Sequence, residues 1–182
     1  MTYPQDYLSG LLNELRALPK ETEWVEFKHN NDEPQEIGEY ISALSNSAAL
    51  VGKASAYLIW GIEDRTHEIL GTTFNPGLKK VGNEELENWL LRLLAPKINF
   101  YFHELVTEKG KVVILEIDRA SRHPVQFQGK EYIRVGSYKK SLKDFPEKER
   151  ELWRVLDATP FEMLTASEKV SSDEVLKLLD FA

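Results

Sequence analysis

Residues 21–30, ETEWVEFKHN, combine the alternation of a β-strand with a high density of charge. Apolar Val25 and Phe27 alternate with charged Glu26 and Lys28, and consecutive side chains of a strand point to opposite faces. The segment therefore predicts a strand with one apolar face, which belongs in a hydrophobic core, and one charged face. The role of the charged face is the first functional question that this sequence raises.

The charged face has two interpretations. In the first, it is the solvated side of an edge strand, where mixed charges also discourage pairing with other chains. In the second, it is part of a metal site, because Mg²⁺ and Mn²⁺ require oxygen ligands from carboxylates on separate segments. Glu26 and Lys28 share a face, so together they could hold a metal ion and polarise a water molecule for attack on phosphate. The residues alone leave both interpretations open.

The rest of the chain alternates helix and strand signals without an internal repeat. Helices are expected at residues 5–18, from 34 onward, between 83 and 96, and at 145–156. Strands are expected at residues 24–28, 56–64, 98–106, 111–117, 124–128 and 131–137, with 67–72 as the hairpin partner of 56–64. The continuous apolar run KVVILEI indicates a central strand. This order predicts an α+β domain, a mixed β-sheet with packed helices, over residues 1–158.

The C-terminal part of the chain departs from this order. Pro160 interrupts the pattern, and residues 159–182 are expected to be the start of a following, truncated segment. A short helix is expected to begin there at Ser172 or Asp173.

The composition limits the function classes. The chain has 182 residues and a net charge of -7, which argues against a protein that coats nucleic acid through a broad positive field. It has no cysteine, which excludes disulfides and thiolate zinc sites. No apolar run is long enough for a membrane span, and no secretory signal is present, so a cytoplasmic location without membrane contact is expected. Any nucleic-acid site must then be a local patch.

A second group of residues has the composition of such a patch. The segment YIRVGSYKK mixes aromatic rings with cations, a combination that stacks on bases and neutralises phosphates. The alternative is a solvated strand end whose lysines keep the surface soluble. The candidate nucleic-acid-binding residues are Tyr132, Arg134, Ser137, Tyr138, Lys139 and Lys140.

Five segments in order carry a family resemblance: ETEWVEFK, ISALSNSAA, YLIWGIED, EILGTTF and HPVQFQGKEYIRVGSYKKSL. From Glu21 to Leu142 the chain resembles the Schlafen AlbA-type domain, a nucleic-acid-binding module once labelled a divergent AAA domain. The resemblance extends to the N-termini of larger bacterial ATP-binding or transcriptional-regulator proteins. It implies an AlbA-like fold, a DNA or RNA partner and, as the leading function, nucleic-acid binding within a bacterial transcriptional regulator. One departure is the long SNSAALVGKASAYL, where many members have two glycines.

The same resemblance sharpens the metal hypothesis. In animal Schlafen proteins, two glutamates and an aspartate form a metal-dependent ribonuclease site. The matching positions here are Glu21, Glu26 and Asp64, which the resemblance implies as Mg²⁺ or Mn²⁺ ligands and catalytic residues, with Lys28 stabilising charge on the phosphate. A ribonuclease is therefore the first alternative function.

Two further expectations concern nucleotides and assembly. The segment ALVGKAS does not meet the phosphate-loop pattern, because Ser47 stands at its first glycine and Ala54 follows Lys53, so no ATP binding is expected here. Animal Schlafen cores resemble two such lobes fused into a clamp, so a single lobe could form a symmetric homodimer. A dimerisation or sensing domain of a larger ATP-binding protein is thus the second alternative.

Overall fold

A computed structural model describes residues 3–18 and 22–158 of the chain. Its helices are α1 (Gln5–Arg16), α2 (Pro34–Leu50), α3 (Leu86–Leu93) and α4 (Pro146–Asp157), with a short 3-10 helix, η1 (Leu142–Asp144). In the described residues no helix combines the length and the apolar character that crossing a membrane requires.

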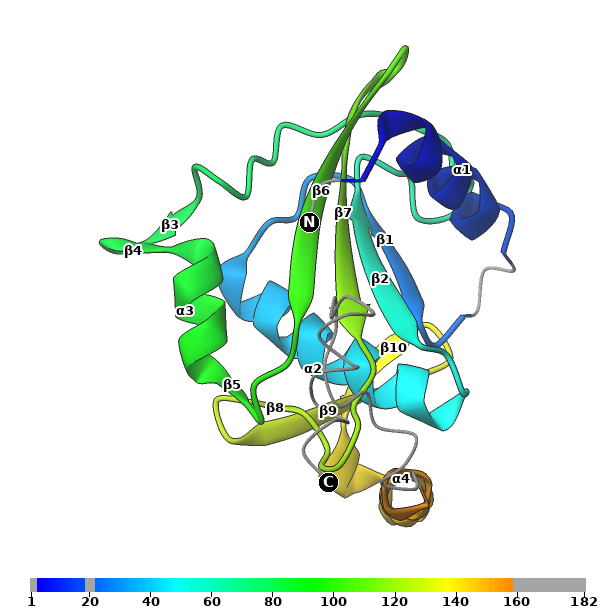
Figure 1. Cartoon of the computed structure of the whole chain (residues 1–182), viewed down its shortest axis with the longest axis vertical. Helices are drawn as coiled ribbons and strands as arrows, with labels where there is room; N and C mark the ends of the chain where they lie inside the picture. Colours follow the sequence, from blue (N-terminus) through cyan, green and yellow to red (C-terminus); the bar gives the residue numbers. More distant parts are fainter. Residues whose placement is uncertain (1–2, 19–21, 159–182) are drawn as a thin grey trace, which may run out of the picture.

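In the described residues the strands form two four-stranded sheets and a short ribbon. Figure 1 shows their arrangement. The first sheet has the order β1-β2-β7-β6 and consists of β1 (Val25–Lys28), β2 (Ser55–Trp60), β7 (Gly110–Asp118) and β6 (Phe100–Thr107). The second has the order β10-β9-β8-β5 and consists of β10 (Tyr138–Ser141), β9 (Lys130–Val135), β8 (Gln126–Phe127) and β5 (Leu94–Ala95). The ribbon pairs β3 (Lys80–Val81) with β4 (Glu84–Glu85).

The first sheet is mixed, as the sequence predicts. Strand β1 runs parallel to β2, while β2 and β6 are antiparallel to the central β7. The apolar segment at 111–117 therefore occupies an inner strand with a neighbour on each side, and β1 lies at one edge. Together with the helices, this arrangement confirms the predicted α+β fold with a mixed sheet.

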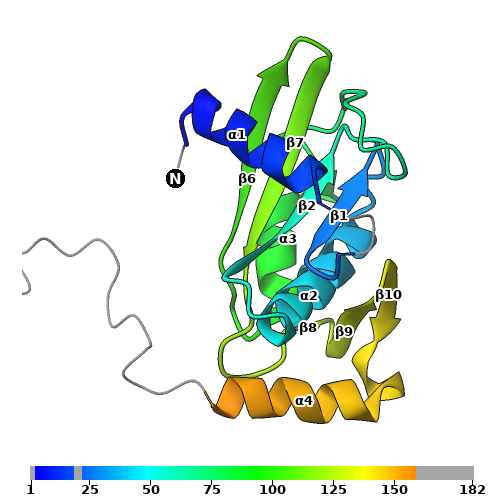
Figure 2. The ribbon, with the colours of Figure 1, turned by 90° about the vertical axis from the view of Figure 1, so that its right-hand side faces the viewer.

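Alternation along the strands divides the apolar residues between two cores. In β2, Ile59 packs on one face with Val25 and Phe27 of β1, while Leu58 and Trp60 pack on the other face. Helix α1 covers the first face, and α2 and α3 cover the second, as Figure 2 shows. The predicted alternation of β1 is thus confirmed, and its charged residues point toward α2 and the second sheet.

Helix α2 connects the two sheets through polar side chains. Asn46 is fully buried and accepts a hydrogen bond from the backbone N–H of Val125 at 2.7 Å, while its amide donates to the carbonyl oxygens of Val125 and Tyr132. Ser42 Oγ accepts the N–H of Tyr132 at 3.0 Å, and Ser47 Oγ accepts the N–H of Arg134 at 2.9 Å. These side chains satisfy backbone groups of β9 and of Val125, the residue before β8, so α2 supplies hydrogen-bond partners that a neighbouring strand would otherwise supply. The long SNSAALVGKASAYL segment forms the end of α2, the connection after it and the first part of β2.

Several boundaries differ from the sequence prediction. Helix α3 begins at Leu86 rather than near Asn83, because residues 84–85 pair with β3. The expected hairpin partner at 67–72 is reduced to a single bridge between Ile62 and Ile69. Strand β10 was not predicted, since YKKS lacks an apolar alternation. The expected helix near Ser172 lies outside the described residues.

Replacing Asn46 by alanine is expected to lower the free energy of unfolding by about 2–4 kcal/mol, because it strips buried backbone groups of their partners. Asn13→Ala on the exposed face of α1 is the matched control and should change stability by less than about 0.5 kcal/mol. Urea unfolding followed by circular dichroism measures both variants. Equal stability of the two would contradict the bridging role of Asn46.

Candidate functional site

The two groups of residues singled out in the sequence meet at one cavity of about 320 Å³. Its walls come from β1, the loop after β2, helix α2 and the β9–β10 hairpin. Six of the ten predicted site residues line it: Glu26, Lys28, Asp64, Arg134, Ser137 and Tyr138. Glu26 of the acidic group and Arg134 of the basic group lie 108 positions apart in the sequence, which predicts two separate sites, whereas the fold places them against each other.

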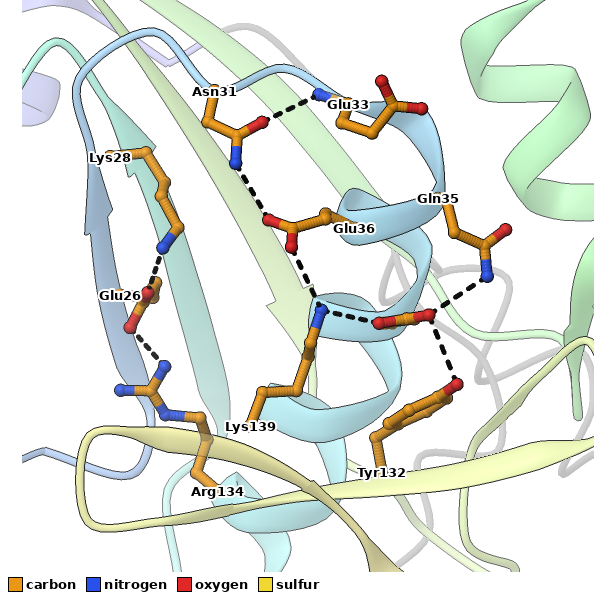
Figure 3. Close-up of polar contacts among 10 residues, drawn as sticks. Glu26, Lys28, Asn31, Glu33, Gln35, Glu36, Tyr132, Arg134 and Lys139 are labelled. Atoms are coloured by element: carbon orange, nitrogen blue, oxygen red, sulfur yellow. Dashed lines mark hydrogen bonds and ion pairs between the residues drawn. The ribbon is translucent and has the colours of Figure 1, made fainter.

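Glu26 lies at the centre of a buried charge cluster (Figure 3). Its side chain carries two ion pairs, one from Oε1 to Lys28 Nζ at 2.6 Å and one from Oε2 to Arg134 Nη1. Glu26 is 6% exposed, so the interpretation of this position as a solvated face is wrong, although β1 is an edge strand. Burial alone would lower the pKa of Lys28, but the adjacent Glu26 carboxylate outweighs it and the pKa lies above its ordinary value.

Arg134 is buried rather than presented at the surface, with 2% exposure. Its Nη1 donates to Glu26, while its Nε is buried and has no hydrogen-bond partner among residues 3–18 and 22–158. Arg134 and Lys28 also flank the ring of Tyr40, with the Lys28 Nζ 4.9 Å from the ring centroid. Burial, and then the negative charge of Glu26, raise the pKa of the Tyr40 hydroxyl. Lys139 Nζ lies 4.5 Å from the centroid of the same ring, so Tyr40 contacts three cations of the described residues.

Lys139 and Tyr132 point toward helix α2 instead of solvent (Figure 3). Lys139 Nζ lies 2.6 Å from Glu39 Oε2 and 3.9 Å from Glu36 Oε1, and the Tyr132 hydroxyl donates to Glu39 at 3.3 Å. Burial by itself would raise the pKa of Glu39, but hydrogen bonds from Lys139 and Gln35 lower it overall. Two cations of the predicted patch, Arg134 and Lys139, are therefore paired with acids of the same chain.

The exposed part of the predicted patch is the tip of the β9–β10 hairpin and the strand that follows it. Gly136 and Ser137 form a two-residue turn, in which Gly136 has a φ of 59°, a left-handed conformation that favours glycine. Tyr138 follows with 68% exposure, and Lys140 Nζ lies 5.6 Å from the centroid of its ring. Since Ser137 and Tyr138 also line the cavity, the exposed ring stands at its rim.

The described residues do not fit a divalent cation. Both oxygens of Glu26 are held by cations, and Asp64 is exposed at the cavity wall. Over residues 3–18 and 22–158 no three His, Asp or Glu side chains gather as a metal site. The third predicted ligand, Glu21, lies outside the described residues, so the complete acidic triad stays a prediction.

The cavity wall includes residues outside the predicted set, and the least expected of these is His67. His67 is 8% exposed, its Nδ1 lies 3.0 Å from the carbonyl oxygen of Arg16, and its ring centroid is 4.4 Å from that of Phe27. Its backbone is left-handed, with a φ of 57°, which is uncommon outside glycine. No sequence pattern indicates this placement, because the contact with helix α1 joins segments that lie far apart in the chain.

The family of the chain follows from comparison with protein-family models. The model described as Schlafen, AlbA_2 matches residues 21–143, more than half of the 182 residues. The chain therefore belongs to the Schlafen AlbA_2 family, as its motifs predict. A search of curated proteins finds no match.

Solved structures provide two further similarities. One is the DIP2311 protein from Corynebacterium diphtheriae, with a TM-score of 0.45 and 16% identity over 75% of this chain and 26% of that chain. The other is the N-terminal domain of a RecG-related protein from Nitrosomonas europaea, with a TM-score of 0.45 and 19% identity over 72% of this chain and 90% of that chain. The present chain thus spans about a quarter of the DIP2311 protein.

Glu26→Gln is expected to lower the free energy of unfolding by about 3–5 kcal/mol, because it leaves Arg134 buried without its counter-charge. Asp64→Asn, at an exposed position of the same cavity wall, should change stability by less than about 0.5 kcal/mol. Chemical unfolding of both variants tests this difference. A Glu26→Gln protein as stable as Asp64→Asn would show that the buried ion pair does not support the fold.

Proposed function

We propose that this chain is a single-stranded nucleic-acid-binding module and serves as the recognition part of a larger bacterial transcriptional regulator. The observation that carries the proposal is the exposed ring of Tyr138, with Lys140 beside it, at the rim of a cavity that contains Lys28 and Arg134. Membership of the Schlafen AlbA_2 family supports it.

The chemistry of this rim suits an unpaired strand. An exposed aromatic ring stacks on any base, and a cation beside the ring contacts the adjoining phosphate. Lys140 and Ser137 are exposed, unlike Arg134 and Lys139, so they are the members of the predicted patch that a ligand meets first. Because the chain carries a net charge of -7, binding must come from such local contacts and not from a general positive field.

Tyr138→Ala is expected to weaken binding of single-stranded oligonucleotides roughly 5- to 150-fold, since stacking contributes about 1–3 kcal/mol per base. Fluorescence anisotropy with labelled RNA and DNA strands of the same sequence measures the affinity and compares the two nucleic acids. Tyr101→Ala is the matched control, because Tyr101 is also exposed (40%) but lies on β6, at the sheet edge opposite β1. Equal loss in both variants, or no loss in Tyr138→Ala, would exclude Tyr138 as the stacking platform.

The alternative function is a Mg²⁺- or Mn²⁺-dependent ribonuclease. One observation favours it, namely that Glu26 and Asp64, two members of the predicted acidic triad, line the same cavity. The two ion pairs of Glu26 count against it, because a carboxylate held by two cations is a poor metal ligand.

The homodimer and the sensing domain stay predictions. Light scattering tests the homodimer directly, because it measures the mass of the particle in solution.

The test of the ribonuclease is cleavage of end-labelled transfer RNA with and without Mn²⁺. Asp64→Asn is the better variant for it, because Asp64 is exposed whereas Glu26 supports the buried cluster. The expected outcome for a binding module is no metal-dependent cutting by wild-type protein. Cutting that requires Mn²⁺ and disappears in Asp64→Asn would establish the enzyme instead.

A further inference from the structure

The cavity beside β1 has a buried floor and an exposed rim. Arg134, Glu26 and His67 at its floor are 2%, 6% and 8% exposed, whereas Ser137 and Tyr138 at its rim are exposed to solvent. Because the floor of this cavity of about 320 Å³ is buried and its rim is exposed, a ligand enters it by inserting a single chemical group from the solvent side. A continuous strand must pass across the rim, where Tyr138 stands.

The charges of the floor do not balance within the described residues. Lys28 and Arg134 share the single carboxylate of Glu26, so one positive charge is left over. Asp64 adds a negative charge, but it is exposed, where water and salt screen it. Two largely buried cations that share one counter-charge carry an electrostatic cost, and a ligand of negative charge lowers that cost.

Within the part of the chain that the structure describes, a hydrogen-bond donor also lacks an acceptor. Arg134 lines the cavity, and its Nε is buried and unpaired although Nη1 of the same group binds Glu26. Unpaired buried donors are rare and mark strain or an absent ligand. A phosphate offers several acceptor oxygens to a guanidinium group, which binds such oxygens with high geometric specificity.

We propose that this cavity binds a phosphate group, and not a divalent cation, with Lys28 and Arg134 as its cationic ligands and the Ser137 hydroxyl as a donor at the rim. A divalent cation here would meet two positive charges for one shared carboxylate, whereas a phosphate meets an excess of donors. The choice of phosphate rests on the proposed function, in which the base beside this phosphate stacks on Tyr138. The cavity and the ring then hold one nucleotide between them.

The test is an NMR titration of the ¹⁵N-labelled protein with inorganic phosphate, at ionic strength held constant with chloride. Saturable shifts are expected for the amides of Lys28 and Ser137, and Lys28→Gln should weaken phosphate affinity roughly ten-fold or more. Lys111→Gln is the matched control, because Lys111 has a similar exposure (25% against 23%) and also pairs with a glutamate, Glu104. Equal affinities in the two variants would overturn the proposal. Lys28→Gln keeps the pair between Glu26 and Arg134, and a thermal unfolding scan verifies its fold.

A second titration with Mn²⁺ in phosphate-free buffer separates anion from cation. The proposal expects no saturable paramagnetic broadening of the cavity amides, and such broadening would assign the cavity to a metal ion and overturn it. Phosphate shifts in a protein that binds no single-stranded nucleic acid would support the phosphate site and refute the proposed function. Binding of a strand through Tyr138 with no phosphate shifts would refute the phosphate site and leave the proposed function intact.

Discussion

At the candidate site, the two sheets are joined by the ion pair between Arg134 and Glu26, whose carboxylate also binds Lys28. Glu26 belongs to β1 of the first sheet and Arg134 to β9 of the second, so the pair fixes the hairpin tip beside β1. Its members are buried, and buried charges persist only when each finds a partner. Glu26 and Arg134 both line the cavity, and Tyr138 lines it as well.

Helix α2 supports the same arrangement by a different physical means. The side chains of Ser42, Asn46 and Ser47 bond to backbone groups of β9 and of the segment before it, in the middle of an apolar core. Hydrogen bonds are directional, so they define one position of β9 against the helix, which apolar packing alone specifies less sharply. Tyr40 of the same helix lies against Lys28 and Arg134, so the polar face of α2 and the charge cluster form one continuous network.

This network pairs two cations that the sequence predicts as ligand-binding residues with acids of the same chain. Arg134 and Lys139 neutralise acids of their own chain, so the exposed part of the predicted patch is reduced to the hairpin tip and Lys140. The chain belongs to the Schlafen AlbA_2 family, and the proposal that it binds nucleic acid rests on Tyr138 and on the Arg134 donor that has no partner among the described residues. A protein of net negative charge can bind a polyanion in this way if a few local contacts dominate.

The sequence by itself determined the features that depend on local order. Alternation in residues 25–28 predicted which face of β1 is apolar, the run at 111–117 predicted the inner strand, and the ordered motifs predicted the family. Only the tertiary structure decided that Glu26 meets Arg134, 108 positions along the chain, and that Lys139 turns toward α2. The reason is physical: side-chain alternation follows from the backbone of one strand, whereas the partner of a buried charge depends on how two sheets dock.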